Sequence, residues 1–443
     1  WREFFSDSDY PSSLTWNLSA NADGSADLNI SSGTGLFYNI DATLQTPGSM
    51  NISSDITEET EDAEVLSLTQ LASGNLTVNV PSNIYIDDID QTAEVRSGSD
   101  LNLLKMAEGS YLGNIIEQEL EYPVVAGAVQ YSNINEQRQF ITRVMLSKKH
   151  ATNDFSAFNG KQYVGMEHFM ELEGSSIDIS VTRLDLTFTN GSGAALLENE
   201  NEVGLLGLIN TANSEFVAAM SIVTPPADPG EAITFTNINQ GHLSFTDSLG
   251  LFALSSSTNL NALIGQYTDW ANISGGDEFN NPAIEFRDSG VSVYLEKPST
   301  PISLDGKTYN IQSVTHYNEV AQAPTGAEQI ASRFYVSVGT GSMSINAGIA
   351  TFTLSEREFV YRYPNDDVTQ VAELISSSQV NSNSWQLQTP AETGSDGCFN
   401  FVDAPTMLAC TNGQGLVMRE YDGATGSTSL DKFLTFYIGS LAP

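Results

Sequence analysis

Histidines and alternating carboxylates are the residues of this chain that could carry acid–base or metal chemistry. Two of its four histidines fall in a repeated pattern, His168-Phe-Met-Glu171 and His316-Tyr-Asn-Glu319. On a helix, residues at this spacing share a face, whereas in a strand they point to opposite faces. A transition-metal site needs three or four converging ligands. Since we expect strands here, neither pattern predicts a metal site.

Two groups of glutamates offer paired carboxylates: Glu117, Glu119 and Glu121, and then Glu167, Glu171 and Glu173. Side chains an even number of positions apart lie on one face of a strand, where two carboxylates could act as acid and base in cleaving a sugar chain. The other interpretation, which we favour in a chain with 55 acidic residues, is a hydrated strand face. The sequence contains no phosphate-binding loop, dinucleotide glycine fingerprint or serine-hydrolase elbow. We therefore expect no enzymatic activity.

One aspartate-rich segment suits a metal ion. Asp87, Asp88 and Asp90 lie close together in the sequence, and calcium prefers several hard oxygen ligands on a flexible loop. Shorter clusters stand at 7–9 and 365–367. None of these segments has the spacing of an EF-hand loop. We expect no cofactor, and calcium bound by the three aspartates is the alternative.

The two cysteines, Cys398 and Cys410, flank a turn at Asp403-Ala404-Pro405. A hairpin with this turn places them opposite one another, close enough for a disulfide. The bridge predicts an oxidising compartment. The chain starts at Trp1 rather than methionine, so we expect that an export signal has been removed. Both observations favour an extracellular or outer cell-surface location.

The net charge is strongly negative. Seventeen basic residues against 55 acidic ones give −38. Nucleic acids and anionic membranes would have to bind against this field, so we exclude both as partners. The longest apolar run, 203–209, is too short to span a bilayer. A hydrophobic content of 40% nevertheless indicates a folded protein.

Internal similarity divides the chain. Segments that resemble one another recur in the same order at an offset of about 150 residues, which is typical of a tandem duplication. The matched pairs are 99–111 with 257–267, 144–149 with 293–298, 158–163 with 304–309, and 241–247 with 397–403. We therefore predict an N-terminal β-rich region at 1–98, which includes a partial repeat, copy one at 99–256 and copy two at 257–443.

Apolar residues alternate with polar ones through both copies, as at Leu184, Leu186 and Phe188. This period predicts short antiparallel strands. A phase slip at 182–183 predicts a bulge or a turn, and the glycines of 339–342 predict a hairpin. Short helices are expected at 56–71, 202–209 and 366–375. The fold class is all-β: two homologous antiparallel β-barrel or β-sandwich modules in tandem, a smaller β-rich N-terminal region and few short helices.

Each copy opens with a short polar–apolar segment followed by Gly-x-Tyr, at Gly109/Tyr111 and Gly265/Tyr267. This pattern resembles lipocalin-like (calycin) barrels, whose first strand carries Gly-x-Trp behind a short helical turn. The resemblance implies up-and-down barrels in tandem, which either hold a small apolar ligand or fill their own interior. β-sandwiches remain the alternative.

Four tyrosines follow turn glycines by two or three positions: Tyr111, Tyr163, Tyr267 and Tyr309. They are candidates for contact with a ligand. The interpretation that we favour is that they are core aromatics closing the ends of a barrel.

Three functional hypotheses follow. The first is a non-enzymatic exported protein that acts by binding or assembly, as a structural, adhesion or filament subunit, with itself or other surface proteins as partners. The second is a carrier of a small apolar ligand. The third is an enzyme acting on polysaccharides. Glycans are also candidate binding partners for a protein of the first class. If the protein assembles, a charge of −38 requires apolar or strand-edge contacts, bridging cations, or both.

Overall fold

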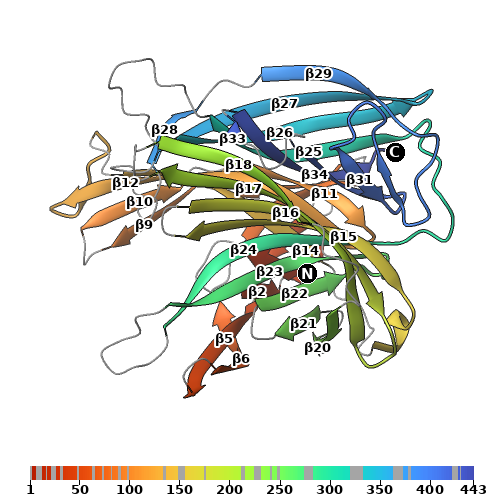
Figure 1. Cartoon of the computed structure of the whole chain (residues 1–443). Coiled ribbons are helices and arrows are strands. Elements are labelled where there is room, and N and C mark those ends of the chain that lie inside the picture. Colours follow the sequence, from red (N-terminus) through yellow and green to blue (C-terminus); the bar gives the residue numbers. More distant parts are fainter. Residues whose placement is uncertain are drawn as a thin grey trace.

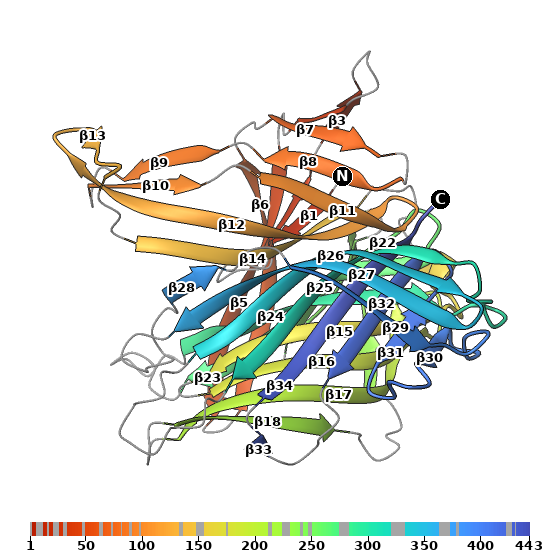
Figure 2. The same cartoon turned by 90° about the horizontal axis from the view of Figure 1, so that it is seen from above.

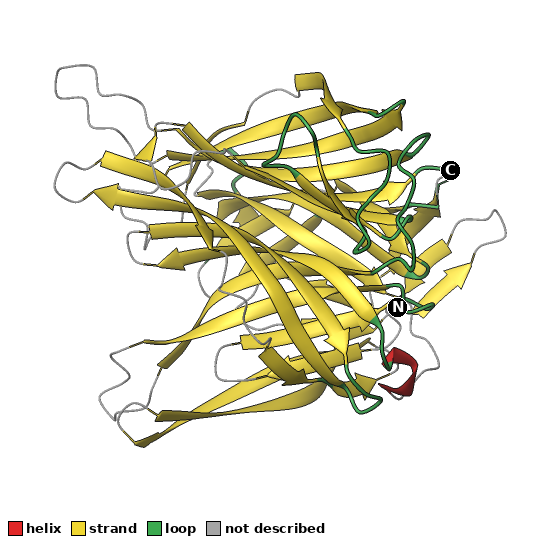
Figure 3. Ribbon diagram, turned by 45° about the vertical axis from the view of Figure 1, so that its right-hand side comes forward, coloured by secondary structure: helices red, strands yellow, loops and turns green. Residues whose placement is uncertain are grey.

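Figures 1 and 3 show a computed structural model of the chain in which the described elements are almost entirely strands. The structure describes residues 2–5, 12–15, 17–20, 26–29, 33–46, 49–61, 65–71, 74–80, 82–87, 91–96, 99–132, 136–147, 155–173, 176–210, 215–223, 231–239, 242–246, 250–273, 283–319, 333–362, 373–377, 381–421, 428–429 and 431–443. Among these, one 3-10 turn at Phe155–Phe158 is the only helical element. The all-β prediction is therefore confirmed.

The strands form three sheets. The first is 14-stranded. Its strands are β1 (Arg2–Phe5), β2 (Ser12–Thr15), β3 (Asn17–Ala20), β4 (Ala26–Asn29), β5 (Gly33–Thr46), β6 (Ser49–Glu61), β7 (Val65–Gln70), β8 (Leu76–Val80), β9 (Asn83–Asp87), β10 (Thr92–Arg96), β11 (Ser99–Ala107), β12 (Ser110–Val125), β13 (Ala128–Val129) and β14 (Glu136–Ser147).

The second sheet is 11-stranded. It comprises β15 (Gln162–Glu173), β16 (Ser176–Phe188), β17 (Ala194–Asn210), β18 (Glu215–Val223), β19 (Glu231–Thr234), β20 (Thr236–Asn239), β21 (His242–Thr246), β22 (Gly250–Ser256), β23 (Ala262–Ile273), β24 (Ala283–Glu296) and β33 (Thr428–Ser429). The short strand β33 comes from far along the chain and pairs with β18.

The third sheet is 9-stranded. It comprises β25 (Thr308–Glu319), β26 (Arg333–Asn346), β27 (Ile349–Arg362), β28 (Glu373–Ser377), β29 (Asn381–Gln388), β30 (Cys398–Asn400), β31 (Leu408–Thr411), β32 (Gly415–Tyr421) and β34 (Asp431–Leu441). The second and third sheets curl into half-barrels, in agreement with the calycin-like resemblance.

The second and third sheets share one order of pairing. In each, the first long strand pairs with its successor and with the last long strand, β15 with β24 and β25 with β34. The third strand, β17 or β27, pairs along one half with β18 or β28 and along the other with β19 or β29. A turn glycine at the same left-handed φ of 75°, Gly160 or Gly306, precedes each first strand. The matched segments 158–163 and 304–309 therefore occupy equivalent places.

This pairing does not follow the predicted module boundaries. Residues 99–147 belong to the first sheet, and the boundary between Ser256 and Ser257 lies between β22 and β23 of the second. The tandem duplication stays a prediction, which the shared pairing order favours. The division at 98/99 and 256/257 likewise stays a prediction.

Among the described residues, apolar side chains pack inside both half-barrels. Inside the second sheet lie Phe158, Tyr163, Phe188, Phe235 and Tyr294 with aliphatic neighbours. Inside the third, Phe352 stacks on Trp385 with ring centroids 4.9 Å apart. Because strand side chains alternate, the opposite faces of the same strands are free to pack elsewhere.

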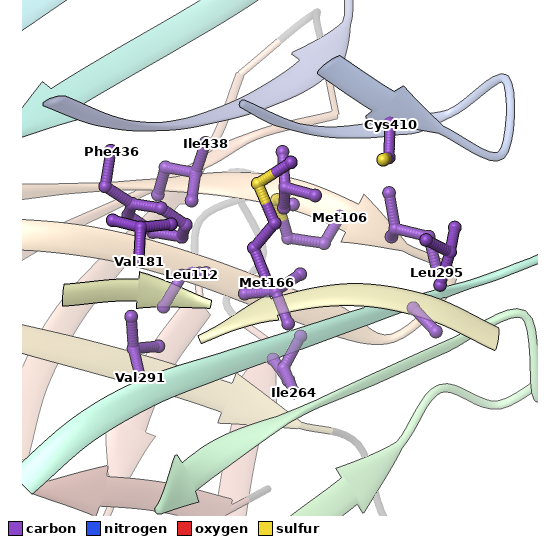
Figure 4. Close-up of a cluster of buried hydrophobic side chains, with 14 of the residues drawn as sticks. Met106, Leu112, Met166, Val181, Ile264, Val291, Leu295, Cys410, Phe436 and Ile438 are labelled. Carbon is purple, nitrogen blue, oxygen red and sulfur yellow. The ribbon is translucent and has the colours of Figure 1, made fainter. Parts of the chain in front are cut away.

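A third core joins the three sheets through these opposite faces (Figure 4). It draws Met106 and Leu112 from the first sheet, Met166 from the second, and Phe436 and Ile438 from the third. Arg419 of β32, 4% exposed, adds polar contacts to this junction. Its guanidinium donates to the carbonyl oxygens of Val181 and Asn201 of the second sheet. The second and third sheets are therefore held together by apolar packing and a buried cation.

Three expectations about local structure were wrong. Residues 56–61 form the end of β6 and residues 65–70 form β7, whereas 62–64 lie outside the described residues. Residues 202–209 lie within β17, and all three strands are paired with their neighbours. The predicted hairpin at 339–342 is continuous strand in β26, where Gly341 packs so closely that an added Cβ would lie 1.9 Å from the Thr353 carbonyl oxygen. Of the third expected helix, 366–372 lies outside the described residues and the rest begins β28.

The phase slip at 182–183 has a different cause from the one expected. β16 pairs with β15 without interruption, so its backbone does not bulge or turn there. Instead, Ile179 and Val181 face the junction core, whereas Leu184 and Leu186 face the interior of the second sheet. One continuous strand buries different faces along its length. The bulge lies on the neighbouring strand, β17. The register between β16 and β17 shifts opposite the segment from Arg183 to Asp185 of β16.

Candidate functional site

The predicted disulfide is present. Cys398 and Cys410 are direct cross-strand partners on β30 and β31, with their Cα atoms 4.0 Å apart and a bond between their sulfurs. Internal similarity predicts that His242 and Leu254 occupy the matching, unbridged positions of the second sheet. The pairing is one residue off, since His242 lies opposite Ser255 and Leu254 lies opposite Leu243.

Three of the four candidate tyrosines have buried side chains. Tyr163 and Tyr309 are 0% exposed and Tyr111 is 5% exposed. The Tyr163 hydroxyl donates to the Leu260 carbonyl oxygen at 2.8 Å, and the Tyr309 hydroxyl lies 3.4 Å from Thr411 Oγ1. Burial raises the pKa of all three hydroxyls. These contacts fit core aromatics: Tyr163 ties β15 to the turn at Leu260, and Tyr309 ties β25 to the end of β31.

The side chain of the fourth, Tyr267, lies outside the described residues; its backbone pairs with Phe252 and Gly290. A role for any of the four in contacting a ligand stays a prediction.

Glu167 is the member of the predicted carboxylate groups that the structure buries. It is 7% exposed and accepts hydrogen bonds from the hydroxyls of Tyr294 at 2.5 Å and Ser292 at 3.1 Å. Burial raises the pKa of Glu167 to about 7, and the hydrogen bonds oppose this shift. A carboxyl group that titrates near neutrality in an apolar interior can serve as a proton donor, provided that a substrate reaches it.

The other predicted carboxylates do not join Glu167. The side chains of Glu117, Glu119, Glu171 and Glu173 lie outside the described residues, and Glu121 is half-buried on the first sheet. The neighbour that acts on Glu167 is instead Glu200, whose charge raises its pKa. The two side chains differ in environment, because Glu200 is exposed.

A second carboxyl–tyrosine contact lies in the third sheet and has no counterpart in the sequence predictions. The Tyr437 hydroxyl donates to Glu420 Oε2 at 2.7 Å. Burial raises the pKa of both groups, and Glu356 raises them further. The sequence does hold a signal for it. Leu416, Met418 and Glu420 are two positions apart and so share one strand face, with the carboxyl at the end of an apolar row.

The two patterned histidines meet. His168 of β15 and His316 of β25 stack with ring centroids 5.1 Å apart, and Phe436 also stacks on His168, at 5.3 Å. Both imidazoles are buried in the packing between the second and third sheets. Among the described residues, no group of three or more His, Cys, Asp or Glu is placed to hold a metal ion. The pair is thus a packing contact between equivalent strands.

The predicted calcium ligands are largely outside the described residues. Asp87 ends β9, where only its backbone is described, and Asp88 and Asp90 lie outside the described ranges. The same holds for Asp7, Asp9 and 365–367. The calcium site stays a prediction.

The feature that sequence reasoning missed is a projecting part of the first sheet, which we call the arm: residues 82–87, 91–96 and 117–131, comprising β9, β10, the end of β12 and β13. Figure 2 shows it extending away from the second and third sheets. It carries four of the six large apolar side chains of the described residues that are clearly exposed. These four are Ile84 (49%), Ile86 (46%), Val125 (58%) and Tyr131 (59%).

The arm is held by a short ladder. β12 pairs with β10, and β10 pairs with β9. Tyr122 is buried and meets Tyr131 edge-on at 5.2 Å, which fixes the loop after β13 against the arm. In the described part of the chain, no helix has the length and hydropathy needed to cross a membrane.

Comparisons with known proteins give distant likenesses. No protein-family model matches the chain, and no curated protein matches it. It is similar to crystal structures of the vaccine antigen transferrin binding protein B from Haemophilus parasuis. One, a tryptophan-to-alanine mutant, has 7% identity over 84% of this chain and 96% of that one, with a TM-score of 0.18. A double mutant has 6% identity over 83% of this chain and 95% of that one, with the same TM-score of 0.18. Intact Ap-TbpB, with N and C lobes, has 7% identity over 82% and 86%, at 0.19.

Proposed function

We propose that this chain is an exported, non-enzymatic protein that acts at the cell surface or outside the cell by binding or assembly through its outer surface. The observation that carries the proposal is the packing of apolar side chains inside both half-barrels, in the part of the chain that the structure describes. Phe352 on Trp385 in one, and Phe158 on Phe188 in the other, occupy the space that a carrier would leave for a ligand. Binding is then left to the exterior.

The disulfide supports export, because cytosolic proteins rarely keep such bonds. The charge of −38 supports a hydrated exterior that stays soluble outside the cell. The only feature that supports the carrier hypothesis is the barrel-like curvature of the second and third sheets. An enzyme acting on glycans would need access to Glu167, whose carboxyl is enclosed by Tyr294 and Ser292.

Four measurements test the proposal. Alkylation of acid-quenched producing cells, without reductant, should leave Cys398 and Cys410 unlabelled. A membrane-impermeant, amine-reactive reagent should label this protein on intact cells. Free thiols would contradict export. Native mass spectrometry should give the bare polypeptide mass, whereas a bound lipid-sized molecule would favour the carrier hypothesis. Light scattering with calcium and moderate salt then separates self-assembly from binding of another protein.

A further inference from the structure

We propose that β29 of the third sheet pairs antiparallel with β29 of a second copy of this chain. This inference rests on the proposed function and deepens it, because it names the contact and the partner. Three properties of β29 carry it: its place at an edge of the sheet, its lack of charge, and the symmetry of the stretch that a partner can reach.

β29 ends one side of the third sheet. Among the described strands it pairs with β27 and with no other. The side chains of Ser382, Ser384 and Gln386 are exposed. An edge strand turns the amide and carbonyl groups of alternate residues away from its sheet, and these groups are a template for a further strand.

One end of the edge shows which residues point outward. The Gln388 amide donates to Asp403 Oδ1 at 2.8 Å, and the Val402 amide donates to the Gln388 carbonyl oxygen at 2.9 Å. Both backbone groups of Gln388 therefore point away from β27. By alternation, the even-numbered residues before it do the same. In the part of the chain that the structure describes, this edge is covered at Gln388 and open from 382 to 386.

The net charge limits where two copies can meet. At −38, two copies repel one another. Proteins also keep open edges apart with charged residues or proline. The long end strand β6 carries four acidic residues, Asp55, Glu58, Glu59 and Glu61. β29 has the sequence Asn-Ser-Asn-Ser-Trp-Gln-Leu-Gln, with neither a charge nor a proline, so two copies can pair here without placing like charges opposite one another.

The outer face of the sheet beside this edge is uncharged as well. Ser384 lies opposite Thr353 of β27, which lies opposite Ser342 of β26. The rows on either side of this one are also uncharged: Gln386, Thr351 and Ser344, and then Ser382, Ser355 and Thr340. The carboxylate of Glu356 lies on the opposite, interior face, where it accepts a hydrogen bond from Asn383 at 2.7 Å. A partner strand thus meets hydroxyl and amide groups on this face.

The open stretch is symmetric about Ser384. In an antiparallel pair centred there, the Ser384 amide of each copy donates to the Ser384 carbonyl oxygen of the other. Ser382 of one copy then lies opposite Gln386 of the other. Every residue from 382 to 386 finds a partner, so the contact closes as a two-fold dimer.

The added strand also covers apolar surface. Trp385 stacks on Phe352 with ring centroids 4.9 Å apart, yet Trp385 and Leu387 are only partly buried at this edge. In the symmetric pair, Trp385 lies opposite Asn383 of the second copy. Covering the two apolar side chains adds to the backbone hydrogen bonds.

Sedimentation velocity of the full chain over a concentration series tests the proposal. The wild type should dimerise, and added salt should tighten the dimer because it screens the net charge. S384P removes both amide donors of the central pair but keeps the ladder to β27, since these amides point away from β27. It should weaken the dimer at least about tenfold.

A second variant, S384K, keeps the backbone and places two cations opposite one another, which should weaken the dimer about fivefold. Two matched controls should dimerise as the wild type does. S384A loses the hydrogen bond from Ser384 Oγ to the Phe352 carbonyl oxygen, as S384P does, but keeps the amide. T353K places the same lysine on the same face one strand further from the edge.

Unchanged dimerisation of both S384P and S384K would overturn the proposal. An effect of T353K as large as that of S384K would also overturn it, because the contact would then be made by the outer face rather than by the edge. A wild type that stays monomeric at every salt concentration would refute the dimer and leave the proposed function to another protein partner. Cytosolic retention with free thiols would refute that function itself.

Discussion

The second and third sheets follow one order of strand pairing, yet they secure equivalent places by different chemistry. The hairpin of β30 and β31 is closed by a disulfide, whereas that of β21 and β22 is closed by Leu243 packing against Leu254. In the second sheet a buried glutamate is held by two hydroxyls, and in the third a glutamate is held by one. The shared pairing order thus fixes the course of the backbone. The side chains that stabilise an equivalent hairpin or strand can be a disulfide, an apolar pair or a hydrogen-bonded carboxyl.

Removing an interior aromatic ring should have the largest effect. Phe188→Ala and Phe352→Ala each delete a ring that is 0% exposed, one from each sheet. Each should lower the free energy of unfolding by about 3–5 kcal/mol. Guanidinium unfolding followed by tryptophan fluorescence measures this, and only Phe352→Ala should also change the native spectrum of Trp385. A loss below about 1 kcal/mol from either variant would show that the ring does not fill a core.

The next effect concerns Glu167 and pH. Its pKa is raised from 4.5 to about 7, so the folded chain binds its proton more tightly than the unfolded chain. The stability contributed by this group is full below about pH 4.5 and is lost as pH rises through about 7. The total is of the order of 3 kcal/mol. Glu167→Gln should flatten the stability curve in this window, as measured by urea unfolding at successive pH values.

Glu420→Gln is the matched variant for that comparison. Burial raises the pKa of Glu420 too, so the sign is the same, but Glu420 is less buried than Glu167 and its slope should be smaller. Superimposable curves for the wild type and Glu167→Gln would show that the carboxyl titrates as an exposed group does.

Opening the disulfide should have a smaller and local effect. The double change of Cys398 and Cys410 to alanine removes a bridge across a short loop, which the chain-entropy model values at about 3 kcal/mol at most. Hydrogen exchange should accelerate at 398–411 and stay unchanged at 242–256. Global unfolding of the chain at room temperature would contradict this separation of the two hairpins.

The smallest expected effect is a difference in stability between phenylalanine variants of the two buried tyrosines, Tyr163 and Tyr309. Tyr163→Phe removes a hydrogen bond of 2.8 Å to a carbonyl and should cost about 1 kcal/mol. Tyr309→Phe removes a longer contact of 3.4 Å and should cost less. Thermal unfolding of the two variants under one buffer gives the order, and a larger loss from Tyr309→Phe would reverse it.

The sequence predicted the strand content and the bridge because both depend on local spacing: the period of two and the twelve-residue separation of the cysteines. It failed at 202–209, where Val203, Gly204 and Leu205 are buried in succession within one strand. An alternation argument assumes one buried face, and the phase change in β16 breaks that assumption.

The candidate sites were harder to predict. The contact of His168 with His316 depends on how the outer faces of two sheets pack, which the spacing within either strand does not encode. The arm was missed for a related reason. Ile84 and Ile86 alternate as core residues do, and only the projection of β9 away from the other sheets leaves them exposed.

The return of the last strand to the first has a consequence for how such a chain can be rearranged. In the third sheet β34 pairs along β25, and the Ala442 amide donates to the Thr308 carbonyl oxygen, so the points of entry and exit are adjacent. The same adjacency joins β24 to β15. A sheet whose entry and exit touch can be spliced into a chain, or cut out of it, as one cassette. New chain ends could likewise be opened at a distant turn, with the old ones joined by a short linker.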